Sequence, residues 1–256
     1  MANQDKRPLI LISNDDGFAF SGIQTLVKVA RRYGDVVAVA PMRQQSGKGC
    51  SITFFEPLRA FKKVEEPGYT AYEVPGTPTD CVKLALDQLL DGRKPDVVLS
   101  GINHGYNYGS CTLCSGTMGV VLEAAVQRLP AVAFSAKPFA PDTDFSSYEP
   151  WIERVLAKVL AHGLPDGVCL NVNMPANARG LKVVRTAMGK WENEFEHRVD
   201  PFGVDYYWVS GEYRSYLPTD SETDVVALAD GWVTVTPCRA DLTERAVMDE
   251  ISALLK

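Results

Sequence analysis

Apolar residues in the first half of the chain form short unbroken runs that alternate with segments of helical periodicity. The runs cover residues 8–13, 35–41, 95–100 and 131–135, and such runs are typical of strands buried on both faces of a parallel sheet. The segments of helical spacing are residues 18–33, 81–90 and 115–125, which predict amphipathic helices. Strand, helix and strand in this order predict βαβ units with right-handed crossovers.

The same alternation continues to about residue 185. Residues 151–162 predict a helix that ends at Gly163, residues 168–175 predict a strand, and residues 54–74 predict antiparallel strands inserted between the parallel ones. We therefore expect an α/β fold, a three-layer Rossmann-like domain around a mostly parallel sheet.

The pattern changes in the last quarter of the chain. Residues 191–199 and 204–213 flank the turn Asp200–Gly203, which predicts a long hairpin rich in aromatic residues. Residues 231–237 predict a late strand, and residues 241–244 predict the cap of a final helix. We expect a catalytic domain over residues 1–188 and an extension over residues 189–256 used in oligomerisation, because an isolated hairpin is marginally stable in water.

Composition and charge narrow the possible functions. The chain has 256 residues, of which 46% are hydrophobic and 23% charged, as in ordinary globular proteins. The net charge of −6 argues against long nucleic acid as a partner. No apolar run is long enough to span a membrane, and the six cysteines suit reduced thiols, so we expect a cytoplasmic protein. The pair Cys111 and Cys114 has redox or zinc spacing, but it stands alone and is a weak signal.

The first predicted strand ends in the sequence Asn14-Asp15-Asp16-Gly17. Two adjacent carboxylates at the end of a buried strand repel each other and need a cation, a proton or a dipole nearby. Gly17 permits the turn that lets both acids line one site. Because ligands of open α/β sheets bind beyond the carboxyl ends of the strands, we place the candidate site here. The alternative interpretation of the two acids is capping of the next helix.

Other oxygen-bearing residues follow neighbouring strands. Ser46 lies in the loop after the second strand, and Asn103 lies in a glycine- and asparagine-rich segment, residues 101–109, which we interpret as a loop. Carboxylate, hydroxyl and amide oxygens without thiolate or imidazole suit a hard cation such as Mg²⁺ or Mn²⁺. Taken alone, Ser46 and Asn103 are better explained as ordinary loop turns.

Two further features have open alternatives. Ser115, Gly116 and Thr117 begin a predicted helix, whose exposed N–H groups favour an anion, but simple capping explains them equally well. His104 is either an acid–base group or a surface histidine. The chain lacks the glycine patterns of phosphate-loop and dinucleotide-binding proteins.

Several ordered motifs together resemble the survival protein SurE family of nucleotidases. The motifs extend from Asn14 into the last third of the chain and are residues 14–17, 40–53, 76–82, 100–105, 115–117, 198–203 and 231–237. Because the motifs occur in a fixed order, the set is far more specific than any single motif.

The resemblance implies a metal-dependent phosphatase that acts on nucleoside monophosphates. It places one divalent cation per subunit on Asp15, Asp16, Ser46 and Asn103. It also implies a homodimer or homotetramer that exchanges C-terminal elements. The sequence departs from the family pattern at residues 42–45 and at Cys50, where a histidine is usual. Neither departure removes a proposed ligand.

The resulting hypothesis is phosphomonoester hydrolysis. Its catalytic residues are Asp15, Asp16, Asn103 and His104, with His104 as proton donor to the leaving nucleoside. Its phosphate-binding residues are Asn14, Ser46, Gly105, Ser115, Gly116 and Thr117. The competing hypotheses are a non-catalytic nucleotide-binding protein and a receiver-like signalling domain, which would need a phospho-accepting aspartate after a later strand.

Overall fold

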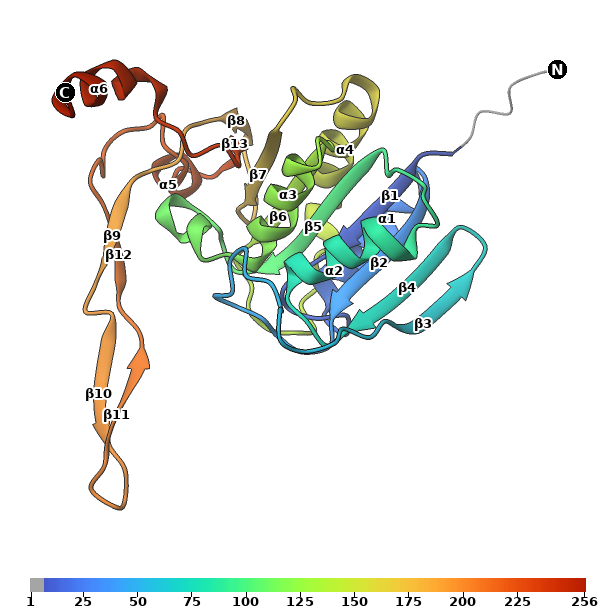
Figure 1. The fold of residues 1–256 in the computed structure, drawn as a ribbon, viewed down its shortest axis with the longest axis horizontal. Helices are drawn as coiled ribbons and strands as arrows, with labels where there is room; N and C mark the ends of the chain where they lie inside the picture. The colour runs from blue at the N-terminus through green and yellow to red at the C-terminus, as the bar shows by residue number, and fades with distance from the viewer. Residues whose placement is uncertain (1–6) are drawn as a thin grey trace.

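A computed structural model describes residues 7–256 and contains a nine-stranded sheet at its centre (Figure 1). The strand order is β3-β4-β2-β1-β5-β6-β7-β13-β8. The strands are β1 (Leu9–Ser13), β2 (Asp35–Pro41), β3 (Phe61–Glu66), β4 (Tyr69–Val74), β5 (Val97–His104), β6 (Ala131–Ala136), β7 (Val168–Met174), β8 (Gly180–Val183) and β13 (Trp232–Arg239).

The sheet is parallel from β4 to β7. At one edge β3 is antiparallel to β4, and at the other β13 is antiparallel to β7 while the edge strand β8 is parallel to β13. Strand β1 lies near the middle, where Leu11 is opposite Val37 of β2 and Val98 of β5. All five residues of β1 are buried, as an unbroken apolar run requires. The predicted fold class is confirmed, and the carboxyl ends of the parallel strands meet at one edge of the sheet.

Helices cover both faces of the sheet and make three layers (Figure 1). The helices α1 (Ser21–Ala30) and α4 (Glu149–His162) supply Ile23 and Ile152 to the core on one face. The helices α2 (Pro78–Leu84) and α3 (Gly116–Val126) supply Val82 and Met118 to the core on the other. The last turns of α2 continue as a π-helical segment, η1 (Ala85–Leu89). Shorter elements are the 3₁₀ turns η2 (Gly109–Leu113), η3 (Ser146–Tyr148) and η4 (Arg245–Val247).

The structure corrects the prediction of a loop over residues 101–109. Strand β5 continues to His104, because after a register shift Asn103 pairs with Ser135 and His104 with Ala136 of β6. Polar and glycine residues there favoured a loop, but the neighbouring strand provides pairing for them. Only the remainder, from Gly105, leaves the sheet. Two elements were not predicted: strand β8 and helix α5 (Asp224–Ala229).

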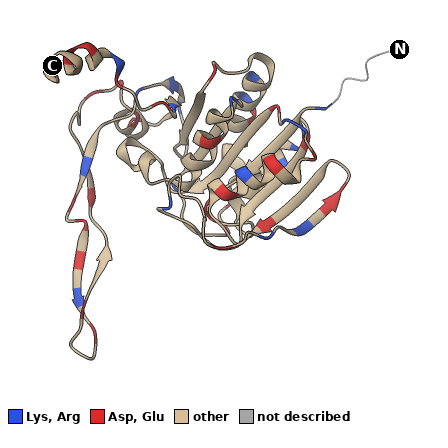
Figure 2. Ribbon diagram, viewed as in Figure 1, with Lys and Arg blue, Asp and Glu red and all other residues tan. Residues whose placement is uncertain are grey.

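The predicted hairpin projects away from the sheet (Figure 1). It consists of two ladders in line, β9 with β12 and β10 with β11. The strands are β9 (Gly189–Glu192), β10 (Phe195–Val199), β11 (Asp205–Val209) and β12 (Glu212–Ser215). Both acidic and basic residues lie along it (Figure 2), while Phe195, Trp208 and Val209 are more than half exposed.

The C-terminal elements divide between the sheet and the exterior. Strand β13 inserts between β7 and β8 of the main sheet, whereas α6 (Met248–Leu254) has no buried residue. The division at residues 188 and 189 stays a prediction, and residues 1–6 lie outside the described part of the chain. Among residues 7–256, no helix has the length and apolar character that crossing a membrane requires.

Candidate active site

Asp15 and Asp16 lie in a tight turn directly after β1. The turn is closed by a reciprocal pair of hydrogen bonds, in which the Gly17 N–H donates to Oδ1 of Asn14 at 3.2 Å and the Asn14 side chain donates to the Gly17 carbonyl at 3.1 Å. Gly17 has a φ of +106°, which glycine adopts without strain. The turn fixes both carboxylates at the carboxyl end of the central strand.

The first turn of α3 packs directly against Asp15. The Thr117 hydroxyl donates a 2.5 Å hydrogen bond to Oδ1 of Asp15. A Cβ atom on Gly116 would lie 2.7 Å from the Asp15 Cβ and 3.0 Å from Oδ2, so only glycine lets the helix approach this closely. Asp15 is only 4% exposed, and its second oxygen is the one nearest the start of the helix.

Asp16 contacts the end of β5 and the loop after β2, the two strands on either side of β1. The backbone N–H of His104, at the end of β5, donates to Oδ2 of Asp16 at 3.1 Å. The Gln44 side chain, from the loop after β2, contacts Oδ1 at 3.4 Å. In the same loop, the Gln45 N–H donates to the Asp15 carbonyl at 2.7 Å. Three segments far apart in sequence therefore converge on the two acids.

The electrostatic environment of the pair is unfavourable for two free carboxylates. Burial raises the pKa of Asp15 to about 6, and the Asp16 charge adds to this, while hydrogen bonds from Thr117 act in the opposite direction. Burial also raises the pKa of Asp16. Among residues 7–256, no lysine or arginine forms an ion pair with either acid. A buried acid pair without a basic partner has the character of a cation site.

The other two predicted ligands differ in how firmly they are held. The Asn103 amide N–H donates to the Gly105 carbonyl at 2.8 Å, so its Oδ1 is the atom left to accept a contact or bind a cation. Ser46 is exposed and follows Gln45 in the loop that contacts Asp15. No cluster of three or more His, Cys, Asp or Glu side chains with metal-binding geometry occurs among the described residues. The predicted donor set, two carboxylates with neutral oxygens from Ser46 and Asn103, is of the kind that suits a hard cation.

Most of the predicted phosphate contacts have other partners in the structure. The Ser115 side chain caps α3 by accepting the Met118 N–H at 3.1 Å, which agrees with the capping interpretation. The Gly105 N–H donates to the Ala136 carbonyl at 2.7 Å, and both polar atoms of the Asn14 side chain bond Gly17. The candidate anion site is therefore the backbone at the start of α3, at Gly116 and Thr117.

The His104 ring lies in an apolar environment. It packs edge-on between Phe20 and Phe145, with ring centroids 5.2 and 4.9 Å away. The residue is 7% exposed, and neither ring nitrogen has a hydrogen-bond partner among the described residues. Burial lowers the pKa of His104, which favours the neutral ring. Its role as a proton donor stays a prediction, whereas its backbone N–H contacts Asp16.

A buried amide network supports the segment after β5. The Asn107 N–H donates to Oδ1 of Asn173 at 2.8 Å, and the Asn171 side chain donates to the Asn107 carbonyl at 2.6 Å. Sequence reasoning missed these residues, although two asparagines at buried positions of a predicted strand are an unusual signal. Gln44 was missed as well, and its position two residues before Ser46 was the available clue.

A second buried carboxylate joins this segment to the root of the hairpin. Asp224 accepts the N–H of Gly109 at 2.9 Å and the N–H of Ala187 at 2.8 Å. The Tyr213 hydroxyl, from β12, donates to the Ala187 carbonyl at 2.8 Å and accepts the Ser110 N–H at 3.3 Å. The loop that leads into α3 and the projecting hairpin thus share one set of anchors.

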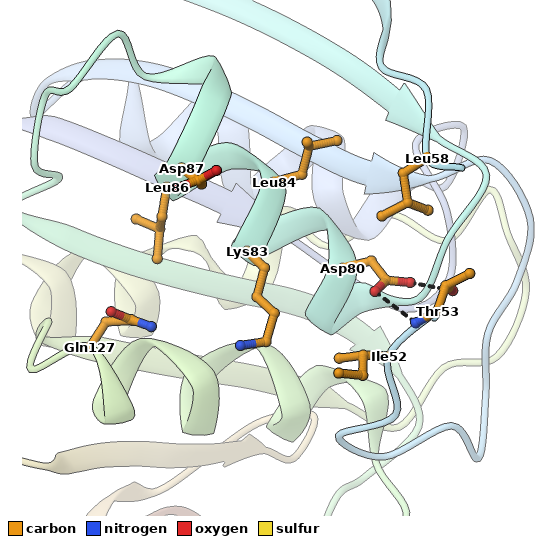
Figure 3. Close-up of a pocket in the computed structure, with 9 residues that line it drawn as sticks. All are labelled: Ile52, Thr53, Leu58, Asp80, Lys83, Leu84, Leu86, Asp87 and Gln127. Carbon is orange, nitrogen blue, oxygen red and sulfur yellow. Dashed lines mark hydrogen bonds between the residues drawn. The ribbon is translucent and has the colours of Figure 1, made fainter. Parts of the chain in front are cut away.

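A cavity of about 520 Å³ is lined by nine residues that include neither Asp15 nor Asp16 (Figure 3). This cavity lies beside α2. One of its lining residues, Asp80, accepts hydrogen bonds from the backbone N–H and the side-chain hydroxyl of Thr53. Lys83 on its border pairs with Glu123. None of the predicted site residues lines it, and we assign it no role.

Comparison with known proteins gives a consistent result. A family model described as survival protein SurE matches residues 10–193. A protein of Cytophaga hutchinsonii named 5′-nucleotidase SurE is 44% identical over 250 residues, covering 96% of each chain. One of Bacteroides fragilis with the same name is 41% identical over 252 residues, covering 98% of each chain. The crystal structure of the SurE protein from Aquifex aeolicus superposes with a TM-score of 0.82 at 36% identity, covering 97% of this chain and 100% of that one.

Proposed function

The chain belongs to the survival protein SurE family, and we infer that it is a 5′-nucleotidase, which hydrolyses nucleoside monophosphates to nucleoside and phosphate. The observation that carries this assignment is the acid pair at the end of β1. Asp15 and Asp16 are buried, close to the start of a helix, and without a basic partner among the described residues. A cation bound to the pair and a phosphate at the helix start would complement each other electrostatically.

We propose that Asp15 and Asp16 hold one divalent cation per subunit, Mg²⁺ or Mn²⁺, with Ser46 and Asn103 as further oxygen ligands. When bound, such a cation neutralises phosphate oxygens and makes a water molecule a stronger nucleophile. The orientation of Asn103 supports this assignment, since its amide N–H is already bonded to Gly105. The hydrogen bond from Thr117 orients Asp15, and the His104 N–H and Gln44 orient Asp16.

The protein's own groups then bind and orient the phosphate. The backbone N–H group of Gly116 at the start of α3 would stabilise negative charge that develops on the phosphoryl oxygens, whereas the Thr117 N–H acts on Asp15. Gly116 permits the close approach that this needs. His104 remains the candidate donor of a proton to the leaving nucleoside, and burial lowers its pKa and favours the neutral ring, which is a weaker acid than imidazolium.

We also propose that the hairpin and α6 pair with a second copy of the chain, in a homodimer or homotetramer. Large apolar side chains such as Phe195, Trp208 and Leu254 are more than half exposed on these two elements, and surfaces of this kind mark interaction sites. The cytoplasmic location expected from composition stays a prediction.

Phosphate release from AMP tests the assignment. We expect turnover with added Mn²⁺, none after chelation, and none for Asp15→Asn with added Mn²⁺, while circular dichroism shows that this variant is folded. A binding protein without catalysis would bind AMP and release no phosphate. Full activity of Asp15→Asn in chelated buffer would overturn the proposed scheme.

A further inference from the structure

A small cavity lies between the loop after β2 and the turn after β4. It has a volume of about 240 Å³ and is lined by Met42, Arg43 and Gln45 from the loop after β2, and by Pro75 and Gly76 from the turn after β4. Both segments follow parallel strands, so the cavity opens at the same edge of the sheet as the acids.

The loop that lines this cavity also contacts the acids. The Gln44 side chain contacts Asp16, and the N–H of the next residue, Gln45, donates to the Asp15 carbonyl at 2.7 Å. A Cβ atom on Gly17 would lie 3.9 Å from the carbonyl carbon of Arg43. The loop of residues 42–45 therefore borders both the cavity and the acid pair.

The polar side chains at the cavity are not used elsewhere. Arg43 is exposed and makes no ion pair within residues 7–256, and no side-chain hydrogen bond holds Gln45 in that part of the chain. By contrast, Arg31 and Arg32, directly after α1, pair with acidic residues. A guanidinium and an amide without side-chain partners among residues 7–256 thus border a cavity whose loop also contacts the acid pair.

We propose that this cavity binds the purine base of the nucleoside monophosphate. Guanidinium and glutamine amide groups are the two kinds of side chain that pair bidentately with the N7 edge of guanine and adenine, an edge that pyrimidines lack. Arg43 and Gln45 contact that edge, while the Met42 thioether and the Pro75 ring pack against the face of the base. The inference rests on the proposed function, because it assumes that the phosphate lies at the acid pair.

Substrates with and without a base separate this role from a phosphate contact. We expect the wild-type protein with Mn²⁺ to favour AMP and GMP over CMP and UMP in kcat/KM. In Arg43→Met and Gln45→Leu the purine nucleotides should lose about tenfold or more in kcat/KM through KM, which is the loss expected for one hydrogen-bonding pair. The kcat/KM for p-nitrophenyl phosphate should change less than about twofold, because this substrate has a phosphate but no base.

Arg154→Met is the matched control, because Arg154 is an exposed arginine of α4 that makes no ion pair among the described residues. It should leave all five substrates unchanged. An equal loss on p-nitrophenyl phosphate in Arg43→Met would mean that Arg43 contacts the phosphate, and equal wild-type rates for purines and pyrimidines would mean that the cavity does not select the base. Either result overturns the proposal.

Nucleoside binding distinguishes failure of this inference from failure of the proposed function. Calorimetric titration with adenosine, guanosine and cytidine needs neither turnover nor a phosphate. Purine binding that is lost in Arg43→Met supports the cavity even if the wild-type protein releases no phosphate. Binding of adenosine and cytidine with equal affinity overturns it even if the protein is an active nucleotidase.

Discussion

The Thr117 hydroxyl donates a 2.5 Å hydrogen bond to Asp15 although 102 residues separate the two in sequence. The contact joins the end of the central strand to the start of α3. It makes Thr117 a residue that orients a proposed cation ligand from behind, in the way that outer-shell groups support metal sites.

Replacing Thr117 by valine tests this role at nearly constant volume. We expect Thr117→Val to lose about 10- to 100-fold in Mn²⁺ affinity and in kcat/KM, the range typical for residues that orient metal ligands. Thr117→Ser keeps the hydroxyl and should stay within a few-fold of wild type. Calorimetric Mn²⁺ titration and AMP hydrolysis provide the measurements, and wild-type Mn²⁺ affinity in Thr117→Val would contradict the role.

Gly116→Ala adds one methyl group where the helix meets Asp15. Because that Cβ would lie 2.7 Å from the Asp15 Cβ, the helix and the acid must move apart. We expect kcat for AMP to fall about 100-fold, as for displacements near 1 Å in an active site. Gly167→Ala is the control, since a Cβ there meets nothing within 4 Å; its φ of +72° strains alanine, so this variant should lose stability and keep the wild-type kcat. Equal kcat in Gly116→Ala and wild type would show that the close approach is unimportant.

Divalent cations should stabilise the fold as well as the activity. At a Mn²⁺ concentration about 100 times its dissociation constant, binding to the folded state alone contributes about 2.7 kcal/mol. For a chain of this size that raises Tm by about 5–10 °C. Asp15→Asn should show no such rise in a thermal scan. A Mn²⁺ effect of the same size in Asp15→Asn would place the stabilising cation elsewhere.

The exposed face of the hairpin offers a test of assembly. Phe195 of β10 lies opposite Val209 of β11, so the double change Phe195→Lys with Val209→Glu removes apolar surface while keeping a favourable cross-strand pair. We expect the dimer or tetramer to become a monomer in light scattering. Exchanging Glu196 and Arg198, which already pair with each other, is the control. An unchanged mass in the first variant would exclude this face as the interface.

Much of the fold could be predicted from the sequence because its strands are buried on both sides. Strands β1, β2 and β6 are apolar except for Ser13, Asp35 and Ser135, and every residue in them but Asp35 is buried. The end of β5 could not be predicted in this way. Its residues 101–104 contain glycine, asparagine and histidine, and they are strand only because β6 continues beside them.

The candidate site could also be predicted only in part. Asp15 and Asp16 were evident because two acids at the end of a buried strand conflict with their surroundings. Thr117 was predicted to contact phosphate, yet its hydroxyl contacts Asp15, since a pairing over such a distance leaves no local pattern. Gln44 was missed for the same reason, and its contact with Asp16 depends on how the loop after β2 folds back.

The anchoring of Asp224 has a mechanical consequence. Because one carboxylate holds both Gly109 and Ala187, the projecting arm cannot pivot at its base without pulling on the chain that leads to α3. A partner subunit bound to the hairpin would therefore affect the position of the segment before α3, and the turnover rate would depend on assembly.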